Sequence, residues 1–175
     1  MNKYYKYISD NTDDLTYYNV CNYIANYFNF SMREYSRFIR ICKMVFPGKY
    51  NQQYSNDGYE KANFYSKTVF IPILIALKMT DLACYHSFSN GKRNDLLIEI
   101  FKKDSYGWFR YLLKRNECFE NSSECIMVKL SDKLTVFYKA VFNYRKPIQI
   151  GSLIFNKDYK DEIIRMANMI ISFQI

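Results

Sequence analysis

Apolar residues recur at helical spacing along most of this 175-residue chain. The pattern i, i+3, i+4, i+7, i+8 marks one buried face of a helix. The first residues to follow this pattern are Val20, Tyr23, Ile24, Tyr27 and Phe28. They predict a helix near residues 14–28. Similar patterns follow down to the C-terminus. They predict an all-α fold, a helical bundle of about seven or eight helices in a single domain of one or two lobes over residues 1–175.

Length and composition fit that prediction. A chain of this size with 49% hydrophobic residues can bury a core without disulfides or metals. The five cysteines include no C-x-x-C pair, and His86 is the one histidine, so we expect no metal site, no cofactor and a reduced, cytoplasmic setting. No apolar run reaches the roughly 20 residues that span a bilayer; the longest, Val69–Leu77, indicates a buried helix segment.

The best-defined helix start is an S-x-x-E capping box formed by Ser31 and Glu34. In such a box each side chain accepts a hydrogen bond from the other residue's backbone NH. Phe30 and Tyr35 occupy the positions of a hydrophobic staple, and Pro47-Gly48 ends the apolar stripe that follows.

Three later signals refine the order of elements. We expect the helix over residues 59–79 to kink or restart near Pro72, because proline cannot donate to the previous turn. A shorter helix follows Asp81 and ends at Asn90-Gly91, a good C-terminal stop. The connection before the last helix includes residues 148–155, part of which we expect to be extended.

Three arginines begin within the capping box and recur at i, i+4 and i+7: Arg33, Arg37 and Arg40. This spacing places all three on one helical face. Arg33 falls in the first turn, where the helix dipole disfavours a cation by roughly 0.3–1 kcal/mol, and a nearby anion would remove that cost. The three side chains are therefore candidates for binding phosphate; the alternative is an ordinary solvated face.

Two segments resemble a known family. The sequence NFSMREYSRFIR at Asn29–Arg40, followed by FIPILIALKMTDLACYHSFSNG at Phe70–Gly91, resembles the helical region after the nucleotide-binding core of KAP family P-loop NTPases. The similarity covers residues 15–91, and residues 92–175 would be a helical extension. The resemblance implies a lid-like module linked to ATP, an NTPase core or another protein as partner, and contact between Arg33 and nucleotide phosphates.

The parts needed for catalysis are missing from the sequence. It contains no G-x-x-x-x-G-K-[ST] loop, and no apolar strand ending in an acidic residue supplies a magnesium ligand. Cys84 lies too close in sequence to His86, on a different side of the same helix, for direct activation. We therefore expect a non-catalytic regulatory or interaction module rather than an enzyme.

The alternative function is nucleic-acid binding by the segment Lys92–Arg115. Ten basic and five acidic residues give residues 59–116 a net charge of +5, out of +8 for the chain. Basic side chains interleaved with aromatic ones can hold a phosphate backbone and stack on bases. The candidates in this segment are Lys102, Lys103, Arg110, Lys114 and Arg115. The plainer interpretation is two amphipathic helices with aromatic side chains inward.

Overall fold

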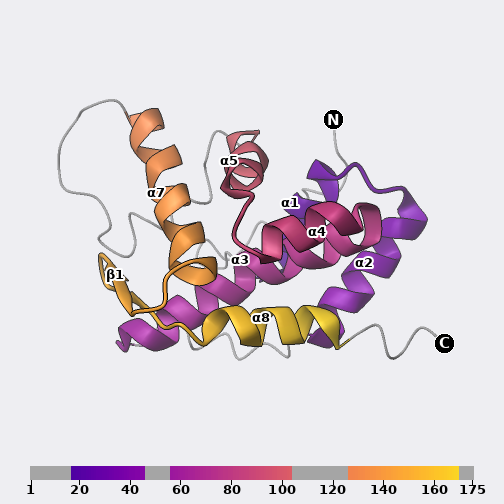
Figure 1. Cartoon of the computed structure of the whole chain (residues 1–175). Helices are drawn as coiled ribbons and strands as arrows, with labels where there is room; N and C mark the ends of the chain where they lie inside the picture. The colour runs from indigo at the N-terminus through magenta and orange to yellow at the C-terminus, as the bar shows by residue number, and fades with distance from the viewer. Residues whose placement is uncertain (1–16, 46–55, 104–125, 170–175) are drawn as a thin grey trace.

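A computed structural model describes residues 17–45, 56–103 and 126–169 (Figure 1). Within these ranges the chain forms seven helices and one two-stranded hairpin. The elements are α1 (Tyr17–Tyr27), α2 (Met32–Val45), α3 (Gly58–Thr80), α4 (Leu82–Ser89), α5 (Asn94–Lys102), α7 (Ile126–Phe142), β1 (Ile148–Ile150), β2 (Leu153–Phe155) and α8 (Tyr159–Asn168). The predicted all-α helical bundle is confirmed.

Helix α3 is the centre of the bundle. It runs through the middle of the molecule, and α1, α2, α4, α8 and β2 pack against it (Figure 1). Every residue of its apolar run Val69–Leu77 is buried, as expected for a helix enclosed on all sides. This enclosure positions the surrounding helices, including α2.

Pro72 lies inside α3 and does not end it. Of the two predicted alternatives, a kink or a restart near Pro72, the restart is wrong, because the helix is continuous from Gly58 to Thr80. Proline removes one backbone hydrogen bond from a helix. The elements packed around α3 bury the whole run Val69–Leu77, and this burial stabilises the helix on both sides of Pro72. Tertiary packing therefore outweighs the local disruption.

Short polar caps set the ends of α3 and α4. The Tyr59 NH donates to Asp57 Oδ1 at 2.8 Å before α3, and the Cys84 NH donates to Asp81 Oδ1 at 2.9 Å before α4. Helix α4 ends at the predicted position, where Gly91 has φ of 77°. A side chain there would also strike Asn143, whose Nδ2 would lie 2.4 Å from an added Cβ.

The hairpin and α8 close one side of α3. Strands β1 and β2 pair antiparallel with Ile148 opposite Phe155, which confirms the extended structure predicted here. The Lys67 ammonium of α3 lies 2.6 Å from Glu162 Oε1 of α8. The Tyr159 hydroxyl donates to the Tyr59 carbonyl at 2.8 Å, which fixes the start of α8 against the start of α3.

An aromatic cluster joins α3 to α4 and α7. The Phe70 ring lies within 6.2 Å, between centroids, of four rings: Phe88, Phe137, Tyr138 and Phe142. The buried Tyr138 hydroxyl donates to the Phe88 carbonyl at 2.5 Å and accepts from the Arg93 NH at 3.2 Å. Tyr138 thus satisfies backbone groups on both sides of the turn after α4.

Replacing Tyr138 by phenylalanine should lower the free energy of unfolding by about 1–3 kcal/mol, because it removes both hydrogen bonds of the buried hydroxyl and takes from the part-buried Arg93 NH its acceptor. Burial raises the pKa of Tyr138 to about 12, above the unfolded value near 10. The stabilisation is therefore complete below about pH 10 and is lost as the pH rises towards 12. Urea unfolding of both proteins from pH 8 to 11 should show the difference shrinking above pH 10. A constant difference would contradict this assignment.

Candidate anion-binding site

The first turn of α2 is fixed by the predicted capping box. The Ser31 NH donates to Glu34 Oε2 at 2.8 Å, the Ser31 hydroxyl donates to the same oxygen at 2.7 Å, and the Glu34 NH donates to Ser31 Oγ at 3.3 Å. These bonds favour the charged carboxylate and lower the pKa of Glu34. The box therefore holds the turn that carries Arg33.

The inner side of α2 determines which side faces out. Its buried residues are Phe38, Ile41, Cys42 and Val45. The Phe30 ring packs 5.2 Å from that of Phe38, between centroids, and the Tyr35 hydroxyl donates to Asn22 Oδ1 of α1 at 2.7 Å. These contacts fix the rotation of α2 about its own axis.

Seven exposed residues form the outer side of α2, which we call the basic face: Met32, Arg33, Ser36, Arg37, Arg40, Lys43 and Met44. At about 100° per residue they fall within an arc of about 140°. Four are basic and none is acidic. Glu34, the acidic residue of α2, lies about 60° outside the arc and is engaged by Ser31.

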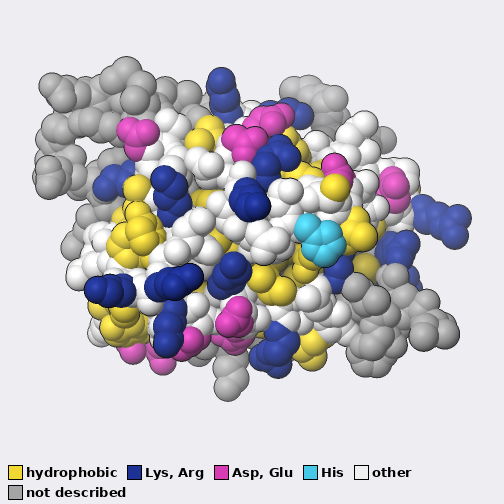
Figure 2. All heavy atoms as spheres, viewed as in Figure 1, with side chains coloured by type: hydrophobic (Ala, Val, Ile, Leu, Met, Phe, Trp, Pro, Cys, Tyr) yellow, Lys and Arg dark blue, Asp and Glu magenta, His cyan; other side chains and the backbone are white. Residues whose placement is uncertain are grey.

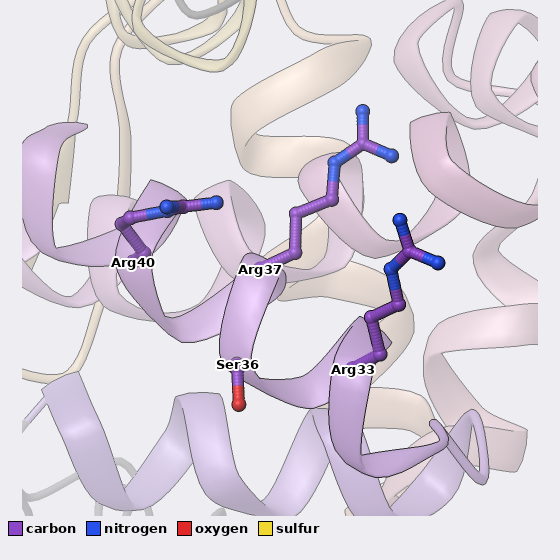
Figure 3. A pocket seen from close by; sticks show the side chains of 4 residues that line it. All are labelled: Arg33, Ser36, Arg37 and Arg40. Carbon is purple, nitrogen blue, oxygen red and sulfur yellow. The ribbon is translucent and has the colours of Figure 1, made fainter.

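The three arginine side chains project from the same side of the helix, and Arg33 and Arg37 point in the same direction (Figure 3). Ser36 turns away from them, and its hydroxyl donates to the Met32 carbonyl at 2.8 Å. Of the described residues, Arg33, Ser36, Arg37 and Arg40 line an open hollow of about 710 Å³. The structure therefore brings together the three arginines that the sequence predicted to share a face.

Arg33 and Arg40 differ from Lys67 and Arg93 in whether their charge is paired within the described residues. Lys67 pairs with Glu162, and the Arg93 Nε lies 3.0 Å from Asp95 Oδ1. Arg33 and Arg40, in contrast, make no hydrogen bond or ion pair with any residue in the described ranges. Figure 2 shows basic side chains gathered at the right edge of the molecule, where α2 lies.

The second predicted site is only partly described. Lys102 and Lys103 are exposed at the end of α5, while Arg110, Lys114 and Arg115 lie outside the described residues. The Lys103 ammonium lies 4.5 Å from the centroid of the Tyr27 ring in α1. The position of this lysine is thus set in part by a cation–π contact within the chain.

The structure describes His86 and three of the cysteines, Cys21, Cys42 and Cys84. His86 is exposed on α4, and burial raises the pKa of the Cys84 thiol, which disfavours its nucleophilic form. Cys21 and Cys42 are fully buried between α1 and α2. Among the described residues no group of His, Cys, Asp or Glu is placed to hold a metal ion.

No helix within the described ranges is long and apolar enough to cross a membrane.

The sequence analysis did not predict the residues at the two ends of the basic face. It singled out the arginines but not Met32, Lys43 and Met44, which share the same outer arc. Projecting the sequence at about 100° per residue would have identified all three. Their exposure, however, depends on the packing of α2 against α1 and α3.

Comparisons with protein-family models, curated proteins and solved structures find no match to this chain. The resemblance to KAP family NTPases therefore rests on the two sequence segments alone. The geometry of α2 is the observation that bears most directly on function.

Replacing Ser31 by alanine should destabilise the protein by about 1 kcal/mol, because it removes the side-chain acceptor of the Glu34 NH. Chemical denaturation at neutral pH measures this loss. Ser36→Ala is the matched control, since its hydroxyl bonds only within the helix, to the Met32 carbonyl. We expect a change below about 0.5 kcal/mol for the control. Equal losses in both variants would contradict the capping role.

Proposed function

We propose that this chain is a non-catalytic helical regulatory or interaction module that binds an anionic group of a partner through the basic face of α2. The observation that carries the proposal is the grouping of Arg33, Arg37 and Arg40 on one exposed side of a capped helix, with no acidic residue in the arc. Such grouping does not stabilise the fold, because like charges on one helical face repel one another.

The chemistry of arginine suits this role. A guanidinium keeps its charge at any working pH and offers several donors in a fixed plane to carboxylate or phosphate oxygens. Arg33, in the first turn of α2, carries an unfavourable interaction with the helix dipole of roughly 0.3–1 kcal/mol. A bound anion would offset that cost, because it is attracted both to the guanidinium and to the positive end of the helix dipole.

The resemblance to KAP family NTPases supports a protein as the partner. In that interpretation the chain acts as a lid-like module for an NTPase core, and Arg33 contacts the phosphates of the nucleotide held there. Another protein with an anionic surface fits the same face. The chain itself contributes no phosphate-binding loop, so it would regulate or recruit rather than hydrolyse.

The alternative function is nucleic-acid binding through Lys92–Arg115. The exposed pair Lys102 and Lys103 supports it. Mobility-shift binding that weakens steeply with salt and depends on these lysines would favour this alternative. Binding that depends on Arg33 and Arg40 instead would favour the α2 proposal.

Calorimetric titration with inorganic tripolyphosphate tests the proposed function. We expect binding at low salt that weakens as salt rises and is lost in the double variant Arg33→Ala, Arg40→Ala. The control replaces two exposed lysines elsewhere, Lys139 and Lys157, and should bind as the parent does. Unchanged binding in the arginine variant, or ATP turnover that requires Arg33, would contradict the proposal.

A further inference from the structure

Two methionines lie at the ends of the basic face. Met32 is 63% exposed and Met44 is 58% exposed, the highest values among the described large hydrophobic side chains. They are twelve residues apart, about 18 Å along the helix axis, with the three arginines between them. Because an exposed apolar side chain lies at each end of the basic face, the best-fitting ligand has apolar groups as well as negative charge.

The two methionines together with the three arginines limit the kinds of anionic ligand that fit the basic face. Phosphate groups would satisfy the arginines but would leave both methionines in water. Methionine is flexible and polarisable, and it is used at surfaces that adapt to a partner's side chains. A ligand with negative charge in the middle and apolar groups at both ends complements the whole basic face.

We propose that the occupant is an acidic amphipathic helix of a partner protein, lying along α2; this inference rests on the proposed function of the same face. Arg33 and Arg40 are seven positions apart, about 10.5 Å along the helix, with Arg37 between them. Carboxylates at i, i+4 and i+7 on a second helix span the same length, so each can meet one guanidinium. Apolar residues beyond them would then cover Met32 and Met44.

The charge of α2 supports this choice of partner. The basic face carries four cationic residues and no acidic one, so an acidic helix meets no repulsion along the contact. Helix α2 is 14 residues long, about 21 Å, which is enough for a partner helix of about four turns. Lys43, whose ammonium lies 5.9 Å from the centroid of the Tyr18 ring, stays beside Met44 at the far end of the face.

The test uses two synthetic helical peptides and tripolyphosphate as probes of the full chain. One peptide carries glutamates at i, i+4 and i+7 with leucines at both ends; the other has serines in place of the leucines. We expect the leucine peptide to bind about tenfold more tightly than the serine peptide. The double variant Met32→Ser, Met44→Ser should remove that advantage and leave tripolyphosphate binding unchanged. Both replaced side chains are exposed, and circular dichroism verifies the fold.

The outcomes separate this inference from the proposed function. If the methionine variant binds the leucine peptide as tightly as the parent, the acidic-helix partner is overturned while arginine-dependent tripolyphosphate binding still supports an anion site. If no probe binds, both proposals fail. Duplex DNA that binds through the arginines more tightly than the leucine peptide would also overturn the acidic-helix partner.

Discussion

Replacing Phe70 by alanine should lower the free energy of unfolding by about 3–5 kcal/mol, one of the largest effects a single change can have on this fold. The Phe70 side chain is 0% exposed, and its ring contacts aromatic side chains from α4 and α7. Alanine would lose the burial of the ring and leave a cavity between three helices. The loss of aromatic pairing adds to the cost of that cavity.

Urea denaturation monitored by circular dichroism measures this loss. The matched control is Tyr59→Ala in the same helix, because the Tyr59 ring is 44% exposed. The Tyr59 carbonyl that accepts from Tyr159 belongs to the backbone and is retained in the control. We expect the control to lose less than about 1 kcal/mol. A loss below about 1.5 kcal/mol for Phe70→Ala would show that the aromatic cluster does not hold α4 and α7 to α3.

Reversing the three charges in Arg33→Glu, Arg37→Glu and Arg40→Glu should weaken tripolyphosphate binding more than about 100-fold. A hydrogen bond to a charged group contributes roughly 1.5–3 kcal/mol, and a carboxylate in its place repels the anion, so a total change above about 3 kcal/mol is expected. The replaced side chains are exposed, so the fold should remain intact. Calorimetry or fluorescence anisotropy measures the affinity.

The matched control reverses three exposed basic residues away from α2: Lys139, Arg145 and Lys157. Each reversal changes the charge by two, so both triple variants fall from +8 to +2. General attraction between a basic protein and an anion would weaken equally in the two variants. A site on α2 requires that only the α2 variant loses the ligand, and equal losses would contradict it.

Most elements of the fold could be predicted from the sequence because their signals are local. The capping box of Ser31 and Glu34, the Asp81 start of α4 and the stop at Gly91 all act within one helical turn. Helix α7 follows the same rule, since Leu134 and Phe137, three residues apart, are both buried on the side that packs on α5 and on Phe70 of α3. These signals depend only on residues that are close in the sequence, so they can be recognised without knowledge of the tertiary structure.

Features that depend on distant residues could not be predicted. The continuity of α3 through Pro72 follows from burial on every side, which no local rule reports. Lys67 and Glu162 pair across 95 residues of sequence. The shared face of Arg33 and its neighbours was predicted from spacing, whereas its exposure depends on how α2 packs against α1 and α3.

The most direct test of the basic face is a nuclear magnetic resonance titration of the full chain with tripolyphosphate at low salt. We predict that the largest chemical-shift changes fall on the backbone of α2 and on the guanidinium groups of Arg33, Arg37 and Arg40. The rest of the described residues should change little, including Lys102 and Lys103 at the end of α5. The largest changes on residues 92–103, with α2 unaffected, would contradict the account.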